Sequence, residues 1–128
     1  MRRESDLPDD WFEKAQREMR RVEVLLADDD IEGAGFHLQQ AAEKYLKGYL
    51  LGRGWKLRRT HDVEVLLNEA LAYDERFEDY LDVGILIREF YVEVRYPFIG
   101  SQPPARRELE QALCTVREMI AIIMADTD

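Results

Sequence analysis

The 128-residue sequence has one cysteine, two histidines and four prolines. A single cysteine excludes an internal disulfide and any cysteine-rich zinc site. Glycine and proline are together too scarce for a linker or a low-complexity chain. No run of about 18 apolar residues is present, so we expect no membrane-spanning segment. The lack of paired cysteines and of a signal-peptide pattern favours a cytoplasmic location.

Positive charge is also in short supply. The chain has 18 Lys and Arg against 27 Asp and Glu, which gives a net charge of −9. Broad electrostatic binding of duplex DNA needs a basic face, so this balance argues against it, although a small local basic site stays compatible. Apolar residues make up 46% of the chain, too many for a disordered protein. We expect one domain over residues 1–128, with its core at about 8–126.

Apolar residues recur at helical spacing in five segments, and no segment alternates as a strand would. The expected helices cover about 8–27, 31–53, 60–73, 77–95 and 104–125. Either Thr60 or Asp62 can cap the third helix, and Pro97 stops the fourth. Short connections predict an all-α fold, a single-domain antiparallel up-and-down bundle of about five helices.

Two arginines fall on the apolar arc of a helical wheel drawn for the fourth helix. Arg88 and Arg95 are seven residues apart, so both point the same way. A guanidinium keeps its charge and must be paired or reach water. For Arg88 the simpler interpretation is a carboxylate partner or a snorkelling side chain. For Arg95, next to Tyr96 and Pro97 at the helix end, we favour an anion site.

The second helix carries a polar stripe opposite its apolar face. Its members are His37, Gln40, Glu43, Lys44 and Lys47. The stripe is either a solvated face, with Glu43 and Lys47 as a stabilising i, i+4 pair, or a groove wall that holds a phosphate or carboxylate near the two lysines. No second histidine stands at metal spacing from His37, so we expect no metal ion and no cofactor.

A basic loop follows the second helix and contains one aromatic residue, Trp55. Stacking and phosphate contacts could let it bind a nucleotide or RNA, but loops with several arginines are also common on ordinary surfaces. His61 then opens the third helix, as an ordered structural contact or as a catalyst. Cys114, between apolar neighbours, is expected in the core. The cations of the loop are Arg53, Lys56, Arg58 and Arg59.

Three stretches resemble proteins of the HEPN-domain family. Residues 37–50 (HLQQAAEKYLKGYL) resemble the family's second helix, residues 60–67 (THDVEVLL) the start of its third, and residues 94–97 (VRYP) the end of its fourth. The resemblance spans about residues 11–125. It implies a helical bundle that commonly dimerises, is associated with nucleotide binding, and often pairs with a minimal nucleotidyltransferase encoded beside it.

Many members of that family are metal-independent ribonucleases of toxin–antitoxin or defence systems. Those enzymes use an arginine followed by four to six residues and a histidine, paired across a dimer. Arg95 could occupy the arginine position, but Gly100, Ser101 and Gln102 stand where the histidine would be, and no histidine follows His61. The motif is therefore absent, and we assign no catalytic residue.

The leading hypothesis is a non-catalytic HEPN-type protein that binds a nucleotide or RNA phosphate, forms a homodimer and pairs with a minimal nucleotidyltransferase. One alternative is a ribonuclease in which His37 or His61 replaces the missing histidine. Another is a pure protein-interaction module that uses the acidic face of the fourth helix. Candidate phosphate-binding residues are Arg95, Tyr96, Arg88, Lys44, Lys47, Gln40 and His37, with Arg58, Arg59 and His61 as secondary candidates.

Overall fold

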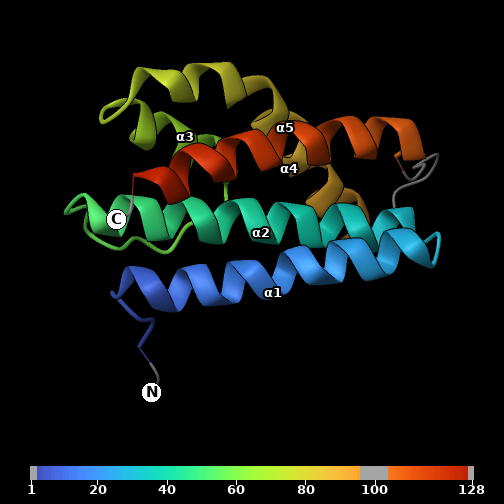
Figure 1. Ribbon diagram of the computed structural model, residues 1–128, viewed down its shortest axis with the longest axis horizontal. Helices are drawn as coiled ribbons and strands as arrows, with labels where there is room; N and C mark the ends of the chain where they lie inside the picture. Colours follow the sequence, from blue (N-terminus) through green and yellow to red (C-terminus); the bar gives the residue numbers. More distant parts are fainter. Residues whose placement is uncertain (1–2, 96–103, 127–128) are drawn as a thin grey trace.

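The computed structural model describes residues 3–95 and 104–126, and for residues 91–95 it describes the backbone alone. Over this part of the chain the structure is helical and contains no strand, which confirms the predicted all-α bundle. The described residues form five α-helices, labelled in Figure 1, and a short 3₁₀ helix, η1, that leads into α4. Their bounds are α1 Pro8–Ala27, α2 Ile31–Gly52, α3 Val63–Leu71, η1 Glu75–Tyr80, α4 Leu81–Arg95 and α5 Arg106–Ala125.

Helices α1 and α2 form an antiparallel hairpin that runs the length of the molecule (Figure 1). The turn between them is a run of three aspartates. Asp29 adopts a left-handed backbone with φ of 61°, a conformation that aspartate tolerates better than most residues. Asp30 then caps α2, because its Oδ1 accepts a hydrogen bond of 2.9 Å from the backbone N–H of Gly33.

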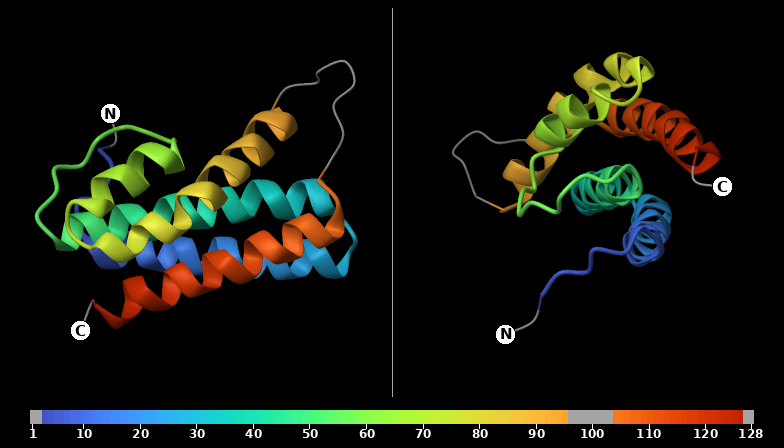
Figure 2. Two further views of the ribbon diagram at one scale, coloured as in Figure 1. Left: turned by 90° about the horizontal axis from the view of Figure 1, so that it is seen from above. Right: turned by 90° about the vertical axis from the view of Figure 1, so that its left-hand side faces the viewer.

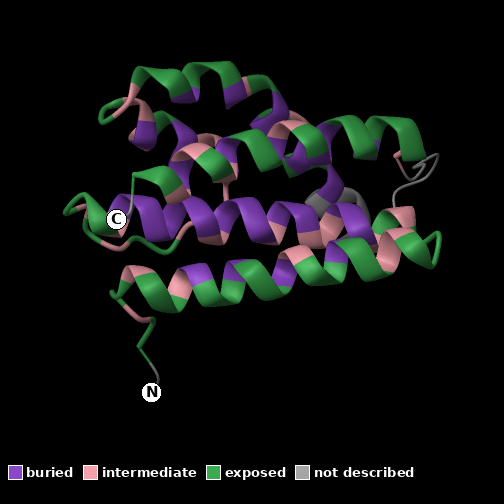
Figure 3. Cartoon of the chain, in the orientation of Figure 1, coloured by how far each residue is buried: buried purple, intermediate pink, exposed green. Residues whose placement is uncertain are grey.

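Helix α2 is the central element of the bundle. It contacts α1 on one side and α3, α4 and α5 on the other, and the two views in Figure 2 show this arrangement. In Figure 3, α2 is buried along most of its length, whereas α1 and α5 keep exposed outer faces. A polar side chain on α2 is therefore buried unless it points between two neighbouring helices.

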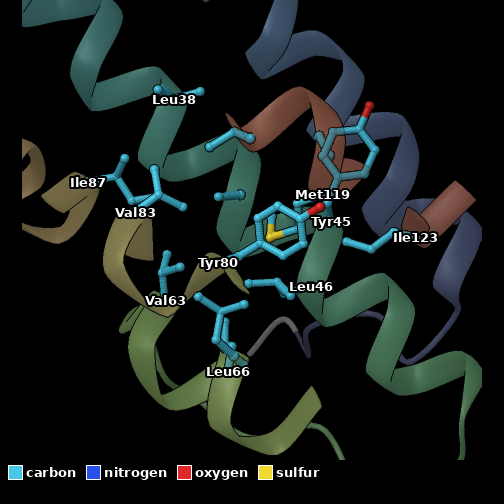
Figure 4. Packing of buried hydrophobic residues seen from close by; sticks show 14 of the residues in the cluster. Leu38, Tyr45, Leu46, Val63, Leu66, Tyr80, Val83, Ile87, Met119 and Ile123 are labelled. Atoms are coloured by element: carbon cyan, nitrogen blue, oxygen red, sulfur yellow. The ribbon is translucent and has the colours of Figure 1, made fainter. Parts of the chain in front are cut away.

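The apolar core lies where the inner faces of the helices meet α2. Figure 4 shows Leu46 of α2, Tyr80 of η1 and Met119 of α5 among the side chains of this cluster. Two glycines allow especially close contacts. A Cβ at Gly48 would lie 2.6 Å from Cε1 of Phe12, and one at Gly84 would lie 2.5 Å from Cδ1 of Leu67. Gly48 thereby sets how closely α1 approaches α2.

The structure corrects the expected orientation of the fourth helix. Ile85 and Arg88 are exposed, although the helical wheel places them on the buried arc. Phe77 and Gly84, which the wheel also places on that arc, are buried as expected, but Tyr80, Val83, Ile87 and Phe90 are buried as well. The chain also begins this segment as a 3₁₀ helix, which turns by about 120° per residue, so a wheel started at Phe77 with 100° steps is out of phase when α4 begins.

Two further findings concern single features. Cys114, expected in the core, is exposed on α5, because the buried stripe passes through Leu113 and Val116. None of the helices in the described ranges combines the length and the apolarity needed to cross a bilayer.

Candidate functional site

A buried carboxylate on α1 gathers polar side chains from α2. Glu18 is only 4% exposed. Its Oε2 lies 3.4 Å from Nδ1 of His37 and 3.6 Å from Nζ of Lys44. Its Oε1 forms an ion pair with the exposed Arg21. Glu18 thus brings two of the predicted phosphate-binding residues, His37 and Lys44, to the same place between α1 and α2.

A second buried carboxylate organises the neighbouring turn of α2. The side chain of Glu43 is 3% exposed, and its Oε1 shares a 2.8 Å hydrogen bond with Nδ1 of His61. Its Oε2 lies 4.0 Å from Nζ of Lys47. Each buried glutamate therefore faces one histidine and one lysine. The i, i+4 pair of Glu43 and Lys47 expected from the sequence is formed, but it lies inside the molecule.

Two glutamines connect these groups. Gln40 Oε1 accepts a 3.0 Å hydrogen bond from Nζ of Lys44, and its Nε2 donates to Oε1 of Gln39 over 2.7 Å. The buried Gln39 in turn donates from Nε2 to the backbone oxygen of His61 over 2.9 Å. The result is a continuous polar network that crosses the bundle from α1 through α2 to the start of α3, where Asp62 caps the helix.

Several predicted site residues lie apart from this network. Arg88 forms ion pairs with Asp62 at 3.4 Å and with Glu64 at 3.2 Å, which agrees with the interpretation that carboxylates take up its charge. Arg58 pairs with Glu69 at 2.5 Å. Arg59 lines a cavity of about 470 Å³ with Trp55 and Lys56. The side chain of Arg95 and the whole of Tyr96 lie outside the described residues.

A further candidate anion-binding surface combines His37, a predicted residue, with three arginines of α1 that were not predicted. A cavity of about 580 Å³ lies beside His37 where α1 faces α2, and no acidic residue lines it. Arg17 pairs with Glu13 and Arg21 with Glu18, whereas Arg20 has no ion-pair partner within the described part of the chain. We call these lining residues the arginine surface: Arg17, Arg20, Arg21, Val24, Leu25 and His37.

The arginine surface has the chemistry of an anion-binding site. Among the described residues, no group of three or more His, Cys, Asp and Glu side chains is placed to hold a metal ion. Guanidinium groups match phosphate oxygens in geometry as well as in charge. The apolar part of the cavity wall, Val24 and Leu25, can contact a sugar or a base. The arginine surface can therefore hold a phosphate-bearing ligand.

Comparison with known proteins places this geometry in context. The family model described as the HEPN domain matches residues 8–126. The crystal structure of the protein TT1696 from Thermus thermophilus is similar, with a TM-score of 0.79 and 29% sequence identity. The match covers 94% of this chain and 98% of that one. No curated protein matches the sequence.

Proposed function

Because the chain belongs to the HEPN domain family, we propose that it is a non-catalytic binding protein for the phosphate groups of a nucleotide or RNA. The observation that carries this proposal is the arginine surface. Three arginines and His37 line one cavity without an acidic residue, on a chain whose net charge is −9. Arg17 and Arg21 are already paired with glutamates, so Arg20 is the arginine of this surface whose charge is open to attract a polyanion.

The test is binding of a short fluorescein-labelled oligoribonucleotide and of ATP, followed by fluorescence anisotropy at low salt. Arg20 is the one arginine of this surface that pairs with no acidic residue in the described part of the chain. Arg20→Glu reverses its charge, so we expect this substitution to weaken the binding of both ligands strongly. The matched control is Arg107→Glu on α5, an exposed arginine away from this cavity. Equal affinity in the Arg20→Glu and Arg107→Glu proteins would remove the proposal.

We propose further that the protein forms a homodimer and pairs with a minimal nucleotidyltransferase. Membership of the family supports this assembly. Sedimentation velocity at tens of micromolar tests the first part, and a species of only 15.1 kDa would argue against a dimer. Co-purification with the product of a neighbouring nucleotidyltransferase gene tests the second part. A role in a toxin–antitoxin or defence system is the setting that these two results would support.

A ribonuclease with a displaced histidine is the second candidate, and the pair of Glu43 and His61 favours it. A buried carboxylate that holds one nitrogen of an exposed imidazole leaves the other nitrogen free for proton transfer. The test is cleavage of a fluorogenic RNA by the purified protein. We expect no cleavage. If the wild type cleaves the RNA, His61→Ala abolishes cleavage and His37→Ala retains it, the protein is a ribonuclease and the binding proposal is wrong.

A further inference from the structure

Lys47 is an unusual lysine because its ammonium group is buried without a hydrogen bond. The residue is 0% exposed, and Nζ has no hydrogen-bond partner within the described structure. The nearest carboxylate oxygen, Oε2 of Glu43, is 4.0 Å away, which is too long for a hydrogen bond. A buried charge without such partners is costly to maintain. Lys47 is therefore a cation with unused capacity to bind an anion.

Trp11 of α1 covers this ammonium group. Nζ of Lys47 lies 4.9 Å from the centre of the indole ring, so the ring face supplies the attraction that an anion would otherwise provide. A residue that precedes α1 holds the indole in place: Nε1 of Trp11 donates a 2.7 Å hydrogen bond to the backbone oxygen of Ser5. Ser5 is fixed in turn by its Oγ, which donates to Oδ2 of Asp10 and accepts from the N–H of Leu7.

The cover has room to move. Trp11 lines a cavity of about 380 Å³, together with Ser5, the basic residues Lys14, Arg17 and Lys44, and the acidic residues Glu4, Asp10 and Glu13. Residues 3–7 precede α1, and all except Ser5 are exposed. Arg3, Glu4 and Asp6 border a second cavity, while Leu7 borders a third. The segment that anchors Trp11 thus has hollows on several sides and little packing.

We propose that Lys47 and Lys44, with the amide of Gln40, form a phosphate subsite that opens when Trp11 moves outward into the adjoining cavity. The two lysines stand on the same stripe of α2 one turn apart, and Lys44 already lines that cavity. Ammonium groups bind phosphate as point charges and need no fixed approach direction. Glu43 keeps its hydrogen bond to His61. The anion competes with Glu43 for Lys47, and with Gln40 and Glu18 for Lys44.

This subsite deepens the proposed phosphate binding and rests on it, but it uses different residues from the arginine surface. Trp11 and Trp55 are the only tryptophans, so a Trp55→Phe protein carries Trp11 as its single reporter. Sodium phosphate is titrated into it against sodium chloride of equal ionic strength. We expect a saturable red shift of the emission with phosphate alone, and stronger quenching of Trp11 by acrylamide.

Variants in the same background then assign the response. Lys47→Met should abolish the shift, whereas Lys56→Met, a neutralised exposed lysine beside a neighbouring cavity, should retain it. Circular dichroism checks the fold, and if Lys47→Met does not fold, Lys44→Met takes its place and should raise the phosphate concentration needed. No shift in Trp55→Phe, or an undiminished shift without the lysine, overturns the proposal.

The Arg20→Glu substitution separates the two proposals. It should weaken RNA binding and leave the response of Trp11 to inorganic phosphate intact. If Arg20→Glu still binds RNA with wild-type affinity, the proposal for the arginine surface is wrong and the proposal for the lysine subsite is unaffected. If Trp11 fluorescence does not respond to phosphate in a protein that still binds RNA, the subsite proposal is wrong and the proposal for the arginine surface is unaffected.

Discussion

The imidazole of His61 is 65% exposed, yet its Nδ1 lies 2.8 Å from a carboxylate oxygen of the buried Glu43. The backbone oxygen of the same histidine accepts a hydrogen bond from the buried Gln39. Two buried polar groups therefore hold one surface residue, Glu43 by its imidazole and Gln39 by its backbone. On its other side Glu43 faces Lys47, so its carboxylate balances a charge inside the bundle as well.

Replacing Glu43 by alanine should destabilise the protein by about 3–5 kcal/mol, because Lys47 then becomes a buried charge without its acidic partner. Urea denaturation measures the free energy of unfolding. The control is Glu64→Ala, which breaks the exposed pair with Arg88 and should cost less than about 1 kcal/mol. Similar losses in the two variants would show that Glu43 does not balance Lys47.

Replacing Arg20 by alanine should weaken RNA binding by a similar factor for every sequence, because a phosphate contact carries no base specificity. The slope of log K against log salt concentration should become shallower by about 0.7 for the lost contact with a single strand. Anisotropy titrations at several salt concentrations measure this slope. Arg107→Ala should leave it unchanged, and a wild-type affinity that is independent of salt would contradict the prediction.

Replacing Gly48 by alanine should lower the melting temperature. The added Cβ would lie 2.6 Å from Phe12, and such overpacking costs about 1–3 kcal/mol, which exceeds or cancels the helix-propensity gain of about 1 kcal/mol. Gly52→Ala is the matched control, because its Cβ would meet only Pro8 at 3.9 Å. We expect no loss there. A higher melting temperature for Gly48→Ala would show that α1 and α2 can separate without cost.

Asp74 should make the stability of the folded protein depend on pH in the acidic range. Hydrogen bonds from Arg76 hold the pKa of this carboxyl below its ordinary range. A carboxyl with a lower pKa in the folded state stabilises the protein above the unfolded-state pKa, about 3.9, and loses this effect as the pH falls through the folded-state pKa. Asp74→Asn should therefore melt below wild type at pH 7.

The difference in melting temperature between Asp74→Asn and wild type should shrink in acid below that range. Asp82→Asn, at an exposed position on α4, should track the wild type at both pH values. A constant difference for Asp74→Asn across the whole range would mean that the amide disturbs η1 in some other way.

The sequence was sufficient to predict the helices, because each long helix repeats its apolar residues at a spacing near 3.6. The predicted bounds of the first helix agree with α1, and of the two candidate caps, Thr60 and Asp62, it is Asp62 that caps α3. The orientation of α4 was not predictable in the same way. Apolar residues occur around most of that helix, so the wheel offered more than one buried face, and the 3₁₀ start shifted the phase.

The candidate site was predictable only in part. The stripe on α2 was visible in the sequence. In the structure His37 and Lys44 both contact Glu18, and Lys44 also donates a hydrogen bond to Gln40. Burial of Glu18 and Lys47 was not visible, because the sequence does not show which polar positions a neighbouring helix will cover. The arginines of α1 were missed for the same reason, since a charged helix face is normally just solvated.

The three-aspartate turn between α1 and α2 also bears on how the chain folds. It joins two long helices that contact each other along their length, so this pairing closes only a short loop and costs little chain entropy. Contacts of α5 with α2, in contrast, must wait for a much longer loop to close. We expect the hairpin to be largely formed in the folding transition state, so that changes within it alter the folding rate and changes in α5 alter the unfolding rate.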